Sequence, residues 1–314
     1  MKYIKSDTLN KMIENNEEKM IFDAEAMYSM QIDCITNQLL EIKKTRPVVL
    51  LSGPSGSGKT STANLIAANL MKHSCEACVI SLDNYFKSNS TPDMPLDEKG
   101  NTDLESPYCM DLPLFQKHLN LIHEKKEFMM PIFDFKTQKR ANFIPFRRNH
   151  KSVVILEGIH ALNPLVTGNS DEFTTCIYVS VRTRIKSPEN KILHPRLIRL
   201  SRRLCRDCLF RGRNIEDVFR YFESVSNGED KYILPYKNRA FFNVDTFMDY
   251  ELPVYKSILY DSMKNSAEKL YANKNYNNIM YFLDHIKSLD KKFIPENSMI
   301  CLLYTSPSPR DSTS

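Results

Sequence analysis

A glycine-rich octapeptide constrains this chain more than any other feature of its sequence. Residues 53–60 read Gly-Pro-Ser-Gly-Ser-Gly-Lys-Thr and satisfy the pattern G-x-x-x-x-G-K-S/T. The glycines let successive backbone N–H groups turn inward around a polyphosphate, and the N-terminus of a following helix adds the positive end of its dipole. An apolar run at residues 47–51 precedes the octapeptide, and apolar residues at helical spacing follow it. This strand–loop–helix order is the context that the motif requires, so we expect a binding site for nucleotide phosphates.

The residue types in this loop predict a role for each position. Lys59 is expected to reach the β- and γ-phosphates, and the hydroxyl of Thr60 is expected to ligate Mg²⁺. ATP and Mg²⁺ are therefore the expected cofactors. The residues expected to contact the nucleotide are Gly53, Ser55, Gly56, Ser57, Gly58, Lys59, Thr60 and Ser61.

The other apolar runs predict an α/β fold. Residues 78–82, 153–156 and 176–179 are short and continuously apolar, as expected of parallel strands covered on both faces, and residues 241–246 fit a last strand. Helical segments such as residues 111–124 alternate with these runs. The sequence therefore predicts a P-loop fold, a parallel β-sheet with helices on both faces.

Composition divides the chain of 314 residues into three parts. Residues 1–45 contain no glycine and predict a helical N-terminal extension. Residues 46–300 form the predicted phosphate-loop domain, with an arginine-rich helical lid at about residues 183–215. Residues 301–314 are polar, rich in Ser and Pro, and resemble translated sequencing-adapter text. We therefore predict that this tail is non-native and disordered.

Cellular location follows from what the sequence lacks. No apolar run is long enough to span a bilayer, and the charged N-terminus resembles no secretory signal. The eight cysteines are then expected to be reduced thiols of a cytoplasmic protein without a membrane partner. The two C-x-x-C pairs, Cys75/Cys78 and Cys205/Cys208, could contribute to a zinc site, but incidental core thiols are the better interpretation.

Two carboxylates stand where predicted strands end. Asp83 follows residues 78–82, and Glu157 follows residues 153–156. The carboxyl ends of parallel strands face the ligand crevice, so Asp83 could take a proton from an attacking hydroxyl and Glu157 could hold Mg²⁺ or its waters. A turn cap and a strand-end surface carboxylate are the alternatives for the two residues. Phe133 and Phe135 flank a further carboxylate and could either stack on a base or belong to the core.

Basic residues concentrate in one stretch, residues 182–213, which holds eleven Arg and Lys residues and two acids. From Pro195 the pattern predicts a helix with one apolar stripe and one arginine stripe. Such arginines could stabilise the charge on a transferring phosphoryl group from a movable lid. A solvated basic face and an RNA-contacting face remain alternatives. The arginine stripe comprises Arg196, Arg199, Arg203 and Arg206, and Arg211-Gly212-Arg213 follows it.

These segments together resemble the uridine kinase and phosphoribulokinase family, over roughly residues 47–300. The most specific features are Pro-x-Phe-Asp-Phe at 131–135, Leu-Glu-Gly-Ile at 156–159, and Arg-Arg-x-x-Arg-Asp-x-x-x-Arg-Gly-Arg at 202–213. Residues 228–235 and 250–254 look like the bacterial-type uridine kinase branch. The resemblance implies transfer of the ATP γ-phosphate to a nucleoside 5′-hydroxyl.

The resemblance also implies roles for individual residues. Asp83 matches the catalytic base, which with Lys59 and Arg206 completes the expected catalytic set, and Glu157 matches the acid near Mg²⁺. Gln138 stands where animal-type uridine kinases carry a base-contacting histidine, and Phe133 replaces a tyrosine. The residues expected on the substrate side are Phe86, Asp103, Glu105, Phe133, Phe135, Gln138, Arg203, Arg211 and Arg213.

Three readings of the function follow in order of preference. The first is a uridine- or cytidine-like nucleoside kinase without a stable nucleic-acid partner, for which the sequence leaves homo-oligomerisation open. The second is a P-loop kinase of another small hydroxyl compound, such as a sugar phosphate or pantothenate. The third is a nucleotide-dependent RNA-binding regulator that uses the arginine helix, for which Asp83 would have no purpose.

Overall fold

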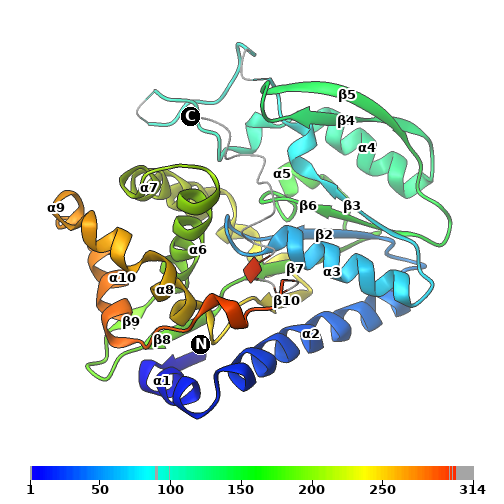
Figure 1. The fold of residues 1–314 in the computed structure, drawn as a ribbon. Coiled ribbons are helices and arrows are strands. Elements are labelled where there is room, and N and C mark those ends of the chain that lie inside the picture. Colours follow the sequence, from blue (N-terminus) through cyan, green and yellow to red (C-terminus); the bar gives the residue numbers. More distant parts are fainter. Residues whose placement is uncertain (1, 89–90, 99, 297, 299, 302–314) are drawn as a thin grey trace.

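A parallel sheet of five strands forms the centre of the computed structural model, which describes residues 2–88, 91–98, 100–296, 298 and 300–301 (Figure 1). The strands lie in the order β10–β7–β2–β6–β3, and every neighbouring pair is parallel. Their bounds are Val48–Ser52 for β2, Ala77–Ser81 for β3, Val153–Glu157 for β6, Thr174–Ser180 for β7 and Phe242–Asp245 for β10. The predicted α/β fold with a parallel sheet is confirmed.

Each face of the sheet carries its own apolar core. Val49 and Leu51 of β2 pack on one face, together with side chains of the helix that follows the octapeptide, whereas Val48 and Leu50 pack on the other face with Phe115. Alternate residues of one strand point to opposite faces, so a strand covered on both sides must be apolar throughout. This explains why the strand segments are continuous apolar runs.

Helices cover both faces, as Figure 1 shows with α2 and α3 on one side of the sheet and α4 on the other. The helix α3 begins directly after the glycine-rich loop, and α4 begins after Asp111, whose side chain caps it by accepting from Leu114 N. The helix bounds are Ser6–Asn15 for α1, Glu17–Ile42 for α2, Lys59–Lys72 for α3, Leu112–Glu124 for α4, Pro164–Thr167 for α5, Pro195–Phe210 for α6, Ile215–Tyr232 for α7, Glu251–Asn265 for α8, Ala267–Leu270 for α9 and Lys274–His285 for α10.

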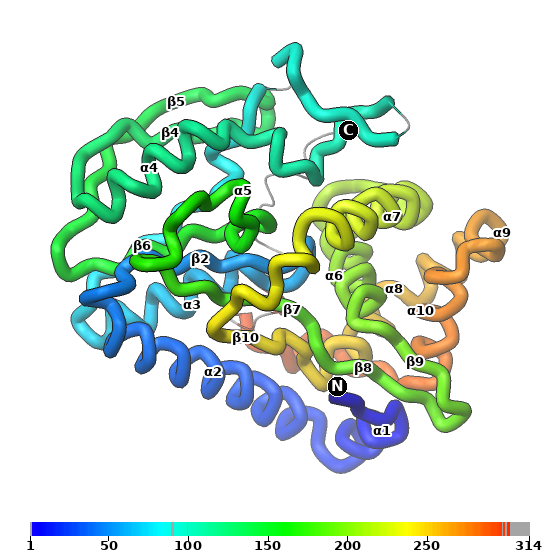
Figure 2. Tube along the Cα trace, turned by 180° about the vertical axis from the view of Figure 1, so that it is seen from behind, coloured from blue at the N-terminus to red at the C-terminus, as the bar shows by residue number. Residues whose placement is uncertain are grey.

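Two small sheets flank the central one. β4 (Phe128–Asp134) and β5 (Lys139–Phe146) form an antiparallel hairpin, with an irregularity between Ile132 and Phe133. β1 (Lys2–Lys5) pairs in parallel with β8 (Thr183–Lys186), which pairs with β9 (Ile192–Leu193). Figure 2 shows from behind how β8 continues from the end of β7 and runs beside the N-terminus.

The N-terminal segment differs from the purely helical expectation. Strand β1 precedes α1, because its backbone finds a partner in β8, which lies far away in sequence and is invisible to local periodicity. Helix α2 packs along α3, where the Tyr28 and Thr62 hydroxyls lie 2.7 Å apart. Gln31 of α2 exchanges two hydrogen bonds with the backbone of Asp245. The expected tail lies, beyond Cys301, outside the described residues.

A buried ion pair joins the arginine helix α6 to the first residue of α8. Nε of Arg202 donates to Oε2 of Glu251 at 2.7 Å, and Nη2 donates to Oε1 at 3.0 Å. The two side chains are only 2% and 0% exposed. Nη1 of Arg202 also donates to the carbonyl of Gly56 at 3.1 Å, so the same guanidinium reaches the glycine-rich loop.

We expect Glu251→Gln to lower the free energy of unfolding by about 3–5 kcal/mol, because it leaves the buried Arg202 charge without its counter-charge. Urea denaturation measures this change. Glu268→Gln, at an exposed position of α9, is the matched control and should change stability little. Equal stabilities for the two variants would contradict a structural role for the pair.

Candidate active site

The glycine-rich loop leaves the carboxyl end of β2, the central strand, and closes over the N-terminus of α3. Gly56 and Gly58 have φ angles of +73° and +88°, the left-handed region that favours glycine. At Gly53 an added Cβ would lie 1.9 Å from the carbonyl oxygen of Val179, so no side chain fits there. The three glycines are therefore required by the shape of the loop.

The polar groups of the loop suit a polyphosphate. Nζ of Lys59 donates to the carbonyl of Pro54 at 3.2 Å and so lies folded over the loop. The buried Oγ of Ser57 has no hydrogen-bond partner among the described residues. Ser55 and Gly56 are half-buried, Ser61 is buried, and Thr60 is exposed at the first turn of α3. Inward N–H groups, a lysine and a helix N-terminus form the donor set that phosphate oxygens accept.

Asp83 and Glu157 lie at the ends of neighbouring strands. Ser81 pairs with Glu157 across β3 and β6, and Leu51 pairs with Glu157 across β2 and β6. Asp83 is the second residue of the short helix η1 (Leu82–Tyr85) rather than the end of the strand. The two carboxylate side chains belong to residues only 9% and 6% exposed. Both residues therefore lie on the same side of the glycine-rich loop, at the carboxyl edge of the sheet.

Close packing and one hydrogen bond fix η1. A Cβ added at Gly158 would lie 2.7 Å from Cβ of Leu82, so Glu157 and η1 can approach only because residue 158 is glycine. The buried Tyr85 hydroxyl lies 3.1 Å from Nδ1 of His118 on α4. Burial lowers the pKa of His118 from 6.5 to about 4, so this ring is neutral at neutral pH.

The aromatic residues expected on the substrate side gather around η1. The ring of Phe133 lies 6.0 Å from that of Phe86 and 4.8 Å from that of Phe135. Phe133 and Phe86 are buried, whereas Phe135 is half-buried. The side chain of Asn84 accepts a hydrogen bond from Phe133 N at 3.2 Å, which ties the β4–β5 hairpin to η1. These rings therefore belong to one cluster next to Asp83.

Gln138 lies in the turn of the β4–β5 hairpin. It has a φ angle of +55°, and its Nε2 donates to the carbonyl of Phe135 at 2.7 Å, inside the hairpin turn. The carboxylate of Asp134 likewise accepts from Lys136 N and from Thr137 Oγ1, both at 2.9 Å. The polar groups of the turn are therefore occupied within the turn itself.

Asp103 and Glu105 lie in a loop packed against α7. The hydroxyl of Tyr232 donates to Oδ2 of Asp103 at 2.9 Å, and Glu105 N donates to Oδ1 at 3.1 Å. A Cβ added at Gly228 of α7 would lie 2.3 Å from Cβ of Glu105, which is 9% exposed. Tyr232 and Gly228 thus position two predicted substrate residues, although only the wider segment around Gly228 was singled out from the sequence.

The arginine stripe is not a solvated face. Arg199 is 3% exposed, donates to the carbonyl of Ser55 at 2.9 Å and pairs with Glu229 at 2.6 Å. Arg203 and Arg206 are each 8% exposed. The alternative of a solvated basic face does not fit these three residues, because carboxylates from α6 and α7 lie within reach of them.

Asp207 is the centre of the second part of this stripe. Its side chain is 0% exposed and lies within ion-pair distance of four arginines. The separations are 3.3 Å for Arg203, 3.2 Å for Arg206, 3.0 Å for Arg211 and 3.8 Å for Arg213. Sequence reasoning counted Asp207 merely as one of two acids in a basic stretch. Its spacing of four residues from Arg203 and from Arg211 was the signal that could have identified it.

Two further observations bear on the sequence expectations. In the described part of the chain, no group of three or more His, Cys, Asp or Glu side chains is arranged to hold a metal ion. Mg²⁺ usually takes one or two protein ligands together with phosphates and water, so Thr60 and Glu157 suit that mode of binding. No helix among the described residues is long and apolar enough to cross a membrane.

Comparison with known proteins gives the family. Residues 48–187 match the model of the Phosphoribulokinase / Uridine kinase family. The chain is 30% identical over 199 residues to uridine kinase from Staphylococcus aureus (strain JH9), covering 63% of this chain and 86% of that protein. It is 29% identical over 200 residues to uridine kinase from Lactobacillus helveticus (strain DPC 4571), with the same coverage.

The solved structures support the fold. A candidate fructose transport system kinase from Silicibacter sp. TM1040 superposes with a TM-score of 0.50 at 21% identity, covering 68% of this chain and 98% of that chain. The family match and the glycine-rich loop together define a P-loop kinase. The chain belongs to the phosphoribulokinase and uridine kinase family.

The lowered pKa of His118 predicts that the folded protein loses stability in acid. The unfolded chain takes up a proton near pH 6.5, whereas the folded protein resists protonation of this ring down to about pH 4. This contribution to stability is therefore complete above the higher value and is lost as the pH falls toward the lower one. Urea unfolding at neutral pH and at an acidic pH between the two values measures how much stability each protein loses on acidification. The His118→Gln variant should lose less than the unaltered chain, because its side chain cannot take up the proton. The same loss in both proteins would contradict the prediction.

Proposed function

We propose that this P-loop kinase transfers the γ-phosphoryl group of ATP to the 5′-hydroxyl of a nucleoside such as uridine or cytidine. The observation that carries the proposal is the buried carboxylate of Asp83 on η1, which follows β3 at the carboxyl edge of the sheet and whose next residue, Asn84, binds the backbone of Phe133 in the aromatic cluster. A hydroxyl compound bound against the aromatic rings would present its oxygen to Asp83 and to the γ-phosphate at the same time. The uridine kinases among its relatives support the choice of a nucleoside.

The residues of the loop would hold and polarise the phosphates. Its inward N–H groups and the N-terminus of α3 bind phosphate oxygens, and Lys59 turns from the Pro54 carbonyl to the β- and γ-phosphates. Thr60 and Glu157 would hold Mg²⁺, which neutralises charge on the phosphate oxygens when bound. The oxygen of the attacking hydroxyl bonds to the γ-phosphorus while the bond from that phosphorus to the leaving ADP breaks. Asp83 accepts the proton that the hydroxyl loses.

The Asp207 cluster would supply the arginines of the lid. Phosphoryl transfer spreads negative charge over the γ-phosphate oxygens, and Arg206, with Arg203, Arg211 and Arg213, would stabilise it. In this structure a carboxylate already gathers these guanidinium groups. Asp207 therefore keeps the cations together, and their outer N–H groups then bind phosphate.

The substrate side would distinguish acceptors by stacking and by ribose contacts. The aromatic cluster offers faces to a base, and Asp103 or Glu105 offers a carboxylate to ribose hydroxyls. Nε2 of Gln138 donates to the carbonyl of Phe135 within its own turn, and this hydrogen bond would compete with a contact to a base edge. This observation favours broad base specificity and keeps another small hydroxyl compound, such as a sugar phosphate or pantothenate, as the second candidate acceptor.

The acceptor and the role of Asp83 can be tested together. Labelled ATP is incubated with a panel of nucleosides, sugar phosphates and pantothenate, and the products are identified. We expect a nucleoside 5′-monophosphate, and we expect Asp83→Asn to lower kcat by about a hundredfold or more while ATP affinity is retained. Asp290→Asn, at an exposed position of the chain, is the control. Product formed only from a non-nucleoside would contradict the proposed nucleoside acceptor. Loss of ATP affinity in Asp83→Asn would contradict the proposed role of Asp83 as the base.

The lid can be tested at Arg206. Arg206→Ala should lower kcat and kcat/KM together, by about a hundredfold, with little change in ATP affinity, because its contacts form mainly in the transition state. Arg206→Lys should recover only part of the loss, since a point charge lacks the planar fork of guanidinium. Arg220→Ala, on the exposed face of α7, is the control. Normal kinetics with weakened, salt-dependent binding of RNA would favour the RNA-binding alternative instead.

A further inference from the structure

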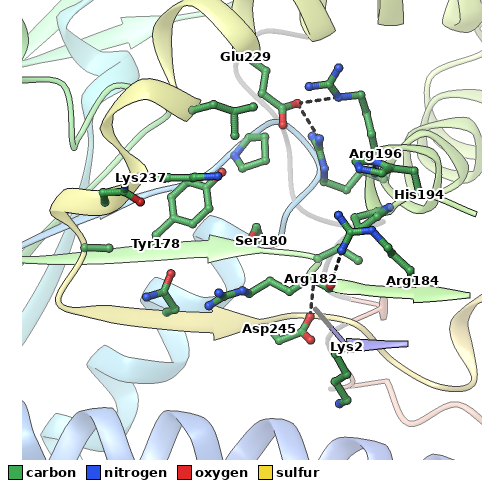
Figure 3. A pocket seen from close by; sticks show the side chains of 18 of the residues that line it. Lys2, Tyr178, Ser180, Arg182, Arg184, His194, Arg196, Glu229, Lys237 and Asp245 are labelled. Carbon is green, nitrogen blue, oxygen red and sulfur yellow. Dashed lines mark hydrogen bonds and ion pairs between the residues drawn. The ribbon is translucent and has the colours of Figure 1, made fainter. Parts of the chain in front are cut away.

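A cavity lies on the other side of the loop from Asp83, at the ends of β7 and β10. It has a volume of about 1000 Å³ and is bounded by the ends of β7 and β10, by β1 and β8, by the start of α6 and by the segment after α7. Of the loop it touches only Pro54, and its lining includes none of Lys59, Thr60, Asp83 and Glu157. Figure 3 shows Lys237 and Tyr178 on one side of this cavity, His194 and Arg196 on the other, and Arg182 between them.

The lining is strongly basic. Six Lys or Arg side chains face two carboxylates, those of Glu229 and Asp245. Both carboxylates are already engaged: Glu229 pairs with Arg199, and Asp245 accepts from Arg182 N and Thr183 Oγ1. The basic residues of the cavity are Lys2, Arg182, Arg184, Arg196, Arg199 and Lys237.

Several of these charges have no counter-charge. In the described part of the chain, the side chains of Arg182 and Lys237 make no hydrogen bond or ion pair, and that of Arg184 makes only a long hydrogen bond of 3.5 Å to a carbonyl, besides lying over the ring of Tyr3. Arg196 differs from these residues, because it pairs with Asp230 at 2.6 Å and its Nε lies 3.8 Å from Glu229. Like charges gathered in one concavity repel one another, so an anion that neutralises them would be bound favourably.

The walls indicate the size and chemistry of that anion. Burial raises the pKa of Tyr178 to about 12, so its hydroxyl stays protonated and can donate. Leu234, Ala240 and Val181 add apolar surface between the charges. The volume lies within the range of sites for small molecules and cofactors. Part of the charge is recessed, since Arg184 and Arg196 are only half-exposed and Arg199 is buried, which suits a small ligand better than a nucleic-acid helix.

We propose that this cavity is a second anion site that binds a small phosphorylated molecule, either a nucleotide or an inorganic polyphosphate. Guanidinium groups bind phosphate oxygens through two parallel N–H groups, and several unpaired cations require more than one negative charge on the ligand. The site is separate from the proposed kinase reaction. It nevertheless contacts the active site, because Arg199 lines the cavity and donates to Ser55 O in the glycine-rich loop.

Isothermal titration calorimetry with inorganic pyrophosphate tests the proposal, because both sites should bind this probe. We expect two sites per chain in the unaltered protein. The double variant Arg182→Glu/Lys237→Glu should retain only the loop site, and Lys59→Ala should retain only the cavity site. Affinity at the cavity should fall by about tenfold or more in the double variant and should weaken with added salt. Lys11→Glu/Lys44→Glu, at two exposed positions of the same charge elsewhere on the chain, is the control for net charge.

The outcomes distinguish a nucleotide from inorganic polyphosphate as the ligand, and they test the cavity site separately from the proposed kinase activity. In the Lys59→Ala background, tighter binding of a nucleoside triphosphate than of pyrophosphate identifies a nucleotide, and the reverse identifies inorganic polyphosphate. A single site in the unaltered protein, or binding unchanged by Arg182→Glu/Lys237→Glu, would overturn the cavity site whatever the kinase assays give. Loss of RNA binding, but not pyrophosphate binding, in the double variant would also overturn it.

Discussion

The structure depends on the carbonyl groups of the glycine-rich loop. When successive N–H groups turn inward to face a phosphate, the carbonyl oxygens between them turn outward and need donors of their own. Each of four consecutive carbonyls accepts a hydrogen bond from a side chain. Pro54 O accepts from Lys59 Nζ at 3.2 Å, Ser55 O from Arg199 at 2.9 Å, Gly56 O from Arg202 at 3.1 Å and Ser57 O from Thr246 Oγ1 at 2.8 Å. The loop is thereby held open from outside, before any ligand binds.

This requirement explains the position of the arginine helix. Arg199 and Arg202 must come from an element that passes directly over the loop, and a Cβ added at Gly56 would lie 3.4 Å from the carbonyl of Arg199. Their buried charges then require carboxylates, which Glu229 of α7 and Glu251 of α8 supply. The loop, the lid and the helix after the last strand are therefore one electrostatic unit, and a change in the charge at the phosphates acts on all of them.

Local sequence patterns predicted the framework well. The five strands of the sheet and helix α4 follow from continuous apolar runs and from an Asp111 cap, both of which depend on neighbouring residues. Helix α6 was also predicted from its local pattern, but the partners of its arginines were not. The pairing of Arg199 with Glu229, and of Arg202 with Glu251, joins residues 30 and 49 positions apart. Periodicity carries no information on such partners, and strand β1 was missed for the same reason.

The basic stretch was treated as one feature in the sequence, and the structure divides it into three. Arg199 and Arg202 bind loop carbonyls, the four arginines around Asp207 form a compact cluster, and Arg182, Arg184 and Arg196 line the cavity at the ends of β7 and β10. A helix turns by about 100° per residue, so arginines spaced three and four apart spread over a wide arc and meet different neighbours. Because Arg199 belongs to both the loop and the cavity, an anion in the cavity changes the field at the same guanidinium that holds the loop. The concentration of charge in this stretch therefore follows from three separate requirements for cations, which are met by α6 and by the segments on either side of it.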